Sequence, residues 1–286
     1  MSLPPGARVL ERVGGGDINE AYHVILADGR EAFVKTRADA ARGEYEAEAA
    51  GLRWLAQPGA LKLPAVLEAG EGHLALQWVK RGRLTAAGEE QLGRGLALMH
   101  AAGAPTFGVR GEGGGARFGS LALPNDPRAD WASFYAENRL LVLARFARER
   151  DALGARGIAA VERVCARMGE LVGPHEPPAR LHGDLWWGNV MAGEDGSAWL
   201  IDPSAYGGHR EMDLAMLRLF GGPSERVFAA YDEQAPLADG WRERVELHQL
   251  APLLVHALLF GGSYRASAER VAARYAQPSR GARCVG

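Results

Sequence analysis

The sequence predicts an α+β fold of two lobes, with a small β-rich N-lobe over residues 1–79 and a larger helical C-lobe over residues 80–286. Two observations predict this arrangement. In the first part of the chain, two strand-like runs (20–26 and 31–36) lie on either side of Asp28-Gly29, a pair typical of hairpin turns. Beyond residue 80, most segments repeat apolar residues at helical spacing.

The other elements follow in chain order. The N-lobe continues with a helix over 41–56 and a strand over 74–79. Prolines at 174, 177 and 178 separate the helices of the C-lobe from a short hairpin, whose strands we place at 190–191 and 199–201. The helices of the C-lobe are expected over residues 89–102, 131–150, 161–171, 213–220, 242–260 and 266–276.

The composition excludes several classes of protein. A formal net charge of −2 gives no reason to expect a nucleic acid or an anionic membrane as partner. The two cysteines, Cys165 and Cys284, do not make a disulfide scaffold. We see no secretory leader at residues 1–6, and the apolar stretch 250–260 is too short to span a bilayer. A cytoplasmic protein is therefore expected. We also expect a monomer or a weak dimer.

Three polar residues have the spacing of a kinase catalytic site. Asp184 and Asn189 lie five positions apart in His-Gly-Asp-Leu-Trp-Trp-Gly-Asn, and Asp202 follows the apolar run 198–201. In kinases, such a carboxylate faces the attacking hydroxyl, while the Asn and the second Asp hold Mg²⁺ on the phosphates of ATP. Either motif alone is more often structural. Their order and spacing together predict phosphoryl transfer, with Asp184 as the base and Asn189 and Asp202 as metal ligands.

A lysine in the second strand of the hairpin completes this pattern. A kinase needs a cation there to meet the phosphates, and a helix carboxylate to hold that cation. Lys35 occupies the strand, and Glu48 is the charged residue on an apolar stripe of the helix over 41–56. Since a lone buried charge is costly, we expect Glu48 to pair with Lys35, with Glu44 as second choice. The other residues of the stripe are Ala41, Tyr45, Leu52 and Leu55.

Further residues are candidates for the cleft. Gly15 and Gly16, in Gly14-Gly15-Gly16-Asp17-Ile18-Asn19, allow backbone N–H groups to approach a phosphate, although a plain turn explains these glycines equally well. Of the adjacent tryptophans, we expect Trp186 to stack on a sugar and Trp187 to pack. Asp17 and His209 are weaker candidates for contact with the substrate.

Three other polar residues are expected to be structural. His182 is expected to support the catalytic loop. Asp213 is expected to cap the helix over 213–220, or else to brace that loop. His248 is expected to lie in the core or at the surface, since no cysteine and histidine set has zinc spacing.

At these residues the chain resembles the fructosamine/ketosamine 3-kinase family, which is related to aminoglycoside phosphotransferases and protein kinases. The most specific match is His182-Gly183-Asp184-Leu185-Trp186-Trp187-Gly188-Asn189. Val34-Lys35, Glu46-Ala47-Glu48 and Ile201-Asp202-Pro203 are similar to the family's lysine, helix and metal segments, and 213–222 and 259–264 resemble its C-lobe signatures. The hinge of the family maps to Leu76-Gln77-Trp78, and the resemblance implies that the backbone of Gln77 and Val79 meets the adenine.

The resemblance implies an activity. The family uses ATP to phosphorylate the sugar O3 of ketosamines, either small molecules or glycated protein lysines, and the phosphorylated adduct then falls apart, which frees the amine. Bacterial members are thought to prefer ribulosamines or erythrulosamines over fructosamines. Gln77 departs from the family's usual Glu, and the glycine-rich segment 111–117 departs from its more specific pattern. A kinase for another amino-alcohol or an aminoglycoside, and a nucleotide-binding protein without turnover, remain as alternatives.

Overall fold

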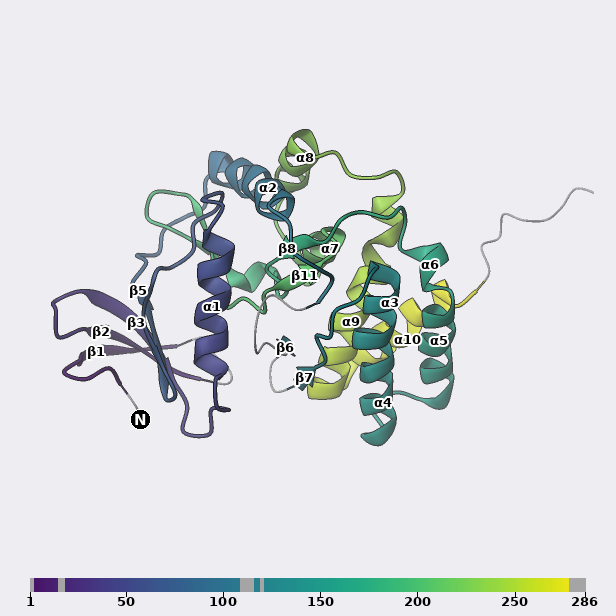
Figure 1. The fold of residues 1–286 in the computed structure, drawn as a ribbon, viewed down its shortest axis with the longest axis horizontal. Coiled ribbons are helices and arrows are strands. Elements are labelled where there is room, and N and C mark those ends of the chain that lie inside the picture. The colour runs from purple at the N-terminus through teal and green to yellow at the C-terminus, as the bar shows by residue number, and fades with distance from the viewer. Residues whose placement is uncertain (1–2, 15–18, 109–115, 119–120, 278–286) are drawn as a thin grey trace, which may run out of the picture.

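A computed structural model describes residues 3–14, 19–108, 116–118 and 121–277. It has a small antiparallel sheet with one helix packed on it, and a larger helical part that lies on the same side as this helix, as Figure 1 shows. The predicted fold class is therefore confirmed.

The N-lobe sheet has five antiparallel strands in the order β1-β2-β3-β5-β4. The predicted hairpin is confirmed: β2 (Glu20–Ile25) pairs with β3 (Glu31–Thr36), and Gly29 at its tip has a φ of 87°, which glycine adopts freely. The sequence does not predict the edge strands β1 (Arg8–Val13) and β4 (Val66–Gly70), because neither alternates between buried and exposed residues. Strand β5 (His73–Gln77), which lies between β3 and β4, ends two residues earlier than expected.

Helix α1 (Glu44–Ala56) lies on the side of the sheet that faces the C-lobe (Figure 1). It begins at 44 rather than 41, because Gly43 precedes it in the left-handed region with a φ of 78°. Its buried stripe, which includes Tyr45 and Leu52, packs against Leu74 and Leu76 of β5. This packing sets where α1 holds Glu48 relative to β3.

The C-lobe is mainly helical, and the structure differs from several of the predicted boundaries. The expected helix over 131–150 contains a π-helical turn at Ala136–Leu140, between α3 and α4. The helix expected over 161–171 starts at Ala155 and is interrupted at Arg167. The sequence does not predict α8. The helices are α2 (Ala86–Ala101), α3 (Trp131–Tyr135), α4 (Leu141–Glu149), α5 (Ala155–Ala166), α6 (Met168–Leu171), α7 (Glu211–Arg218), α8 (Glu225–Gln234), α9 (Trp241–Phe260) and α10 (Ser263–Tyr275).

Short strand pairs carry the functional loops. The predicted hairpin of β9 (Val190–Ala192) and β10 (Ala198–Leu200) is confirmed. The sequence does not predict β8 (Ala179–Leu181), which pairs with β11 (Tyr206–Gly208), or β6 (Ala116–Phe118), which pairs with β7 (Leu121–Leu123). The segment that contains Asp184 leaves β8 and enters β9, and Asp202 follows β10.

The two lobes share a hydrophobic cluster. Leu55, near the end of α1, is buried with Leu92 and Leu96 of α2 and with Leu200 of β10. The Leu200 N–H also donates to the carbonyl of Lys62, at 2.9 Å. The chain between α1 and β4 is therefore attached to the C-lobe, and the hinge is not the sole connection. No helix in the described part of the chain is long and apolar enough to cross a membrane.

The main C-lobe core gives a test of stability. Leu254 of α9 is fully buried in that core, whereas Leu98 of α2 is 47% exposed. We expect Leu254→Ala to lower the free energy of unfolding by about 2–5 kcal/mol, because it leaves a cavity. Leu98→Ala should change it by less than about 0.5 kcal/mol. Urea denaturation of both variants would check this, and equal losses would contradict the assigned core.

Candidate active site

A tight loop between β8 and β9 holds Asp184 and Asn189 together. Gly183 has a φ of 83°, and a Cβ atom there would lie 2.1 Å from the carbonyl oxygen of Ser204, so a side chain is excluded. The Asn189 amide donates to the Asp184 carbonyl at 2.8 Å, and its Nδ2 lies 3.4 Å from the Asp184 Oδ2. The two residues predicted to act together are therefore neighbours in space.

Asp202 reaches the same place from β10. The Ile201 N–H donates to the Asn189 carbonyl at 3.1 Å, which ties the segment before Asp202 to the catalytic loop. Asp202 itself has a φ of 53°, a conformation that Asp tolerates better than most residues. This backbone aims its carboxylate at the N-lobe, where Oδ1 accepts a hydrogen bond from the Lys35 Nζ at 2.9 Å.

Lys35 joins the lobes through two carboxylates. Its Nζ lies 2.5 Å from the Glu48 Oε1 and 2.9 Å from the Asp202 Oδ1, and its side chain is 7% exposed. The predicted contact between Lys35 and Glu48 is confirmed. Glu44, the second choice, pairs with Arg37 instead.

The charges in this group shift one another. Burial opposes the charge on Lys35, but the Asp202 and Glu48 carboxylates outweigh it and raise the pKa of the lysine. Lys35 lowers the pKa of Asp202. Burial raises the pKa of Glu48 to about 7 even beside Lys35.

Asp184 has an increased affinity for a proton. Burial, followed by the negative charge of Asp202, raises its pKa to about 7, while the Asn189 amide acts in the opposite direction. A carboxylate of this kind accepts a proton from a hydroxyl more readily than an exposed one does. This is the property that a base for an acceptor alcohol requires.

Two buried residues, His182 and Asp213, hold the loop between β8 and β9 in place through hydrogen bonds. His182 is fully buried, and its Nε2 lies 2.9 Å from the carbonyl oxygen of Ile201, so the ring joins the loop to the strand that precedes Asp202. The expected supporting role of His182 is confirmed. The expectation that Asp213 caps α7 is wrong, because Arg210 occupies the cap and Asp213 lies in the first turn. Its carboxylate accepts from the backbone N–H groups of His182 and Gly183, so the alternative bracing role is confirmed.

The two adjacent tryptophans have different environments. Trp186 is 40% exposed, and its ring folds over Gly188, where a Cβ atom would lie 2.1 Å from it. Trp187 packs against the cluster that contains Leu185. The structure thus leaves Trp186 accessible to a ligand, while its contact with a sugar stays a prediction.

The structure does not place His209 where a substrate can reach it, because it is 2% exposed and packs against Trp131 and His248. The sequence offers no sign of this, since His209 is buried by helices distant in the chain. Gly15, Gly16 and Asp17 lie outside the described residues.

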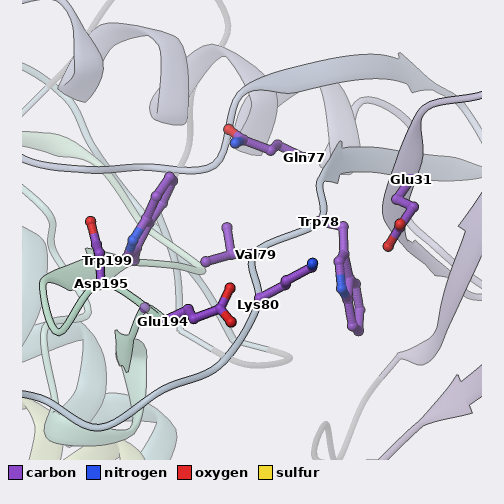
Figure 2. Close-up of a pocket in the computed structure, with 9 residues that line it drawn as sticks. Glu31, Gln77, Trp78, Val79, Lys80, Glu194, Asp195 and Trp199 are labelled. Carbon is purple, nitrogen blue, oxygen red and sulfur yellow. The ribbon is translucent and has the colours of Figure 1, made fainter.

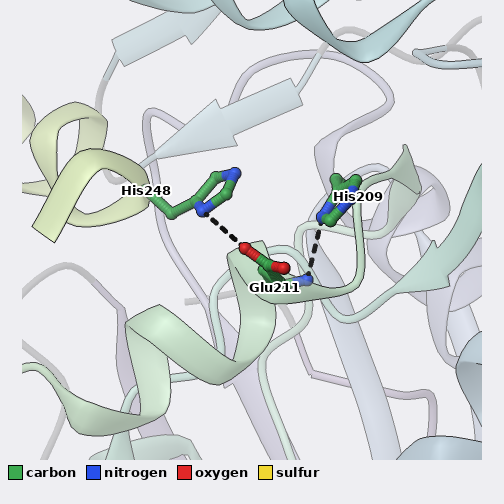
Figure 3. Close-up of side chains that lie close together, drawn as sticks. All are labelled: His209, Glu211 and His248. Atoms are coloured by element: carbon green, nitrogen blue, oxygen red, sulfur yellow. Dashed lines mark hydrogen bonds and ion pairs between the residues drawn. The ribbon is translucent and has the colours of Figure 1, made fainter. Parts of the chain in front are cut away.

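His209, Glu211 and His248 form a buried group that could be taken for a metal site (Figure 3), with one ligand atom from each within 4.8 Å of the others. The hydrogen bonds argue against it. Trp131 Nε1–H donates to His248 Nε2, so a neutral His248 carries its proton on Nδ1. The Glu211 N–H faces His209 Nδ1, so a neutral His209 carries its proton on Nε2. His248 Nδ1 and His209 Nε2 therefore both bear hydrogens and cannot bind a cation. The Glu211 carboxylate already accepts two hydrogen bonds from Arg244.

A pocket of about 560 Å³ lies at the hinge between the lobes (Figure 2). Gln77, Trp78 and Val79 line it from the hinge, and Trp199 of β10 lines it from the C-lobe. Trp78 stacks on His23 of β2, with ring centroids 3.7 Å apart. The Gln77 side-chain oxygen accepts a hydrogen bond from the Ala65 N–H at 3.3 Å. This oxygen is therefore engaged, and a nucleobase at the hinge would bind to backbone groups.

The comparisons with known proteins agree with this geometry. The profile of the fructosamine kinase family matches residues 6–277. A "Probable ketoamine kinase" of Thermus thermophilus is 36% identical over 251 residues, 87% of either chain. The chloroplastic protein-ribulosamine 3-kinase of Arabidopsis thaliana is 32% identical over 264 residues, 90% of this chain and 79% of that one.

Solved structures give the same result. A Thermobifida fusca protein whose name assigns it as a fructosamine-3-kinase superposes with a TM-score of 0.87, at 45% identity, covering 94% of this chain and 93% of that one. The choline kinase LicA from Streptococcus pneumoniae, at 15% identity, superposes with a TM-score of 0.60 over 93% of this chain and 94% of that one, which shows a shared fold alone.

The burial of His209 predicts a dependence of stability on pH. Burial lowers its pKa from 6.5 to about 4, so as the pH falls from 6.5 to 4 the unfolded chain binds a proton that the folded chain does not. This lost stability amounts to about 3 kcal/mol from one group. We expect urea denaturation between pH 7 and pH 4 to show a smaller loss for His209→Gln than for the wild type. Parallel curves would contradict this origin.

Proposed function

The chain belongs to the fructosamine kinase family, and from this premise we propose that it transfers the γ-phosphate of ATP to the sugar O3 of ketosamines. The enzyme is a phosphotransferase of the ketoamine kinase type. The observation that carries the proposal is the Lys35 contact with Glu48 and Asp202, within a lobe arrangement that also holds Asp184 beside Asn189. Phosphoryl transfer depends on positioned charges of this kind more than on covalent chemistry.

The phosphates of ATP would meet Lys35, which Glu48 holds in place. The residues present suit Mg²⁺: Asp202 offers carboxylate oxygens, and Asn189 donates through its Nδ2, which leaves its amide oxygen to bind a cation. Hard oxygen ligands of this kind are those that Mg²⁺ prefers. When bound, the ion neutralises charge on the phosphates.

Asp184 would accept the proton of the acceptor hydroxyl as the oxygen attacks phosphorus. Its raised pKa suits this step, because the carboxylate must take a proton near neutral pH. The loop geometry that excludes a side chain at Gly183 holds the carboxylate in one position. Trp186, which is exposed beside this loop, would stack on the sugar.

The hinge would bind adenine through the backbone of Gln77 and Val79, with Gly15 and Gly16 over the phosphates. We place the division between the lobes at residues 79 and 80, although Leu55 packs into the C-lobe cluster.

Phosphorylation at O3 makes a better leaving group than the hydroxyl, so the adduct would fall apart and free the amine. The name of the Arabidopsis relative supports ribulosamines as acceptors, whereas the names of the family and of the Thermobifida protein support fructosamines.

The test is ATP turnover with Mg²⁺ against ribuloselysine, fructoselysine, choline and an aminoglycoside. We expect turnover on the ketosamines and none on the other two acceptors. Asp184→Asn should abolish transfer but keep the fold, since it removes the base and little else. Wild-type turnover in this variant would contradict the role of Asp184. Turnover on choline or the aminoglycoside instead would identify another acceptor, and ATP binding without turnover would identify a binding protein.

Lys35 gives a separate test of the phosphate site. We expect Lys35→Met to lower kcat/KM for ATP by more than tenfold, about 1.4 kcal/mol in transition-state terms. Arg145→Met is the control, because Arg145 of α4 is exposed and pairs with Glu149, away from the catalytic group and the hinge pocket. An unchanged kcat/KM for Lys35→Met, or an equal loss in the control, would refute the role of Lys35.

A further inference from the structure

We propose that His100 and Tyr231 are positioning residues, which orient the catalytic loop through a one-way chain of hydrogen bonds that ends on Asp213. The chain runs from Tyr231 of α8 through His100 of α2 to Asp213 of α7. It rests on the proposed role of Asp184 as the base. Neither His100 nor Tyr231 belongs to a motif of the sequence analysis.

The end of the chain lies directly under the catalytic loop. The Asp213 carboxylate accepts from the backbone N–H of His182 at 2.7 Å and from that of Gly183 at 2.9 Å. These N–H groups belong to the two residues that precede Asp184, so a movement of the carboxylate would move the base. The third partner of the carboxylate is the His100 Nε2, at 3.2 Å from Oδ2.

The direction of the chain follows from what each group can do. An ionised carboxylate accepts and cannot donate, so His100 must present a proton on Nε2. Burial acts to raise the pKa of Asp213, but the donors around it keep the pKa below its ordinary value, which maintains the charge. In a neutral imidazole, Nδ1 is then an acceptor. The Tyr231 hydroxyl lies 2.8 Å from Nδ1 and must donate to it.

A cation stands at the beginning of the chain. Burial raises the pKa of the Tyr231 hydroxyl, and the positive charge of Arg210 acts to lower it. The Tyr231 oxygen is free to accept because its proton points to His100. Arg210 can only donate, and the Glu176 carboxylate holds it at 2.7 and 2.8 Å. Arg210 thus favours the same direction of hydrogen bonding as Asp213 does from the other end.

The residues of this hydrogen-bond chain are buried, so the loss of any one hydrogen bond would be costly. His100 is 3% exposed and Tyr231 is fully buried, so water cannot replace a lost partner. Helices α2 and α8 pack along each other above the short strands (Figure 1), and a Cβ atom at Gly93 of α2 would lie 2.1 Å from the carbonyl of Val227. This close approach brings the hydroxyl within reach of the imidazole.

The first experiment compares two replacements of His100 in the full-length enzyme. Gln places an N–H donor near the position of Nε2, whereas Leu has a similar size and no donor. We expect His100→Leu to lower kcat at least tenfold with the KM for ATP changed less than twofold, and His100→Gln to keep kcat within threefold. A wild-type kcat in the folded Leu variant, or equal losses in both variants, would overturn the proposal. Tyr231→Phe should also lower kcat, since it removes the donor to His100 Nδ1 and the imidazole proton is then no longer held on Nε2.

The second experiment does not depend on any variant or on turnover. Nitrogen-15 NMR of the imidazoles in the wild-type protein should show His100 protonated on Nε2 and unprotonated on Nδ1. A proton on Nδ1 would overturn the proposed direction. If no ketosamine is phosphorylated, the proposed function fails. The tautomer of His100 still shows whether the hydrogen bonds from Tyr231 to Asp213 run in the proposed direction.

Discussion

The contact of Lys35 with Glu48 and Asp202 is the interaction on which the arrangement of the two lobes depends. It joins β3, α1 and the segment after β10 at one ammonium group. A buried cation requires opposite charges close by, so each of the three elements is held relative to the others. The packing of Leu55 into the C-lobe cluster supports the same alignment from behind. The catalytic geometry is therefore a property of both lobes.

A second layer of polar groups holds the catalytic loop from within the C-lobe. Asp213 satisfies two backbone N–H groups of the loop, and His182 ties the loop to the segment before Asp202. These groups are buried, so each bond that is lost would leave an unsatisfied polar atom. Such a network gives the loop one conformation. The exposed Trp186 is attached to this rigid loop, which suits a surface that receives a ligand.

His209, Glu211 and His248 show how hydrogen bonds decide the character of a cluster. The residue types suit a divalent cation, but Trp131 and the Glu211 N–H place protons on the nitrogens that would bind it. The depressed pKa of His209 then follows from burial. A histidine that the sequence offered as a contact for the substrate is instead a part of the core.

The sequence by itself determined the two-lobed fold class, the β2–β3 hairpin, the order of Asp184, Asn189 and Asp202, and the pairing of Lys35 with Glu48. Each follows from local spacing or from the need of a charge on an apolar stripe for a partner. The edge strands, α8, the burial of His209 and the link from Tyr231 through His100 to Asp213 were decided by tertiary structure. They depend on contacts between segments far apart in the chain, and local periodicity carries no information about which distant side chain will meet another.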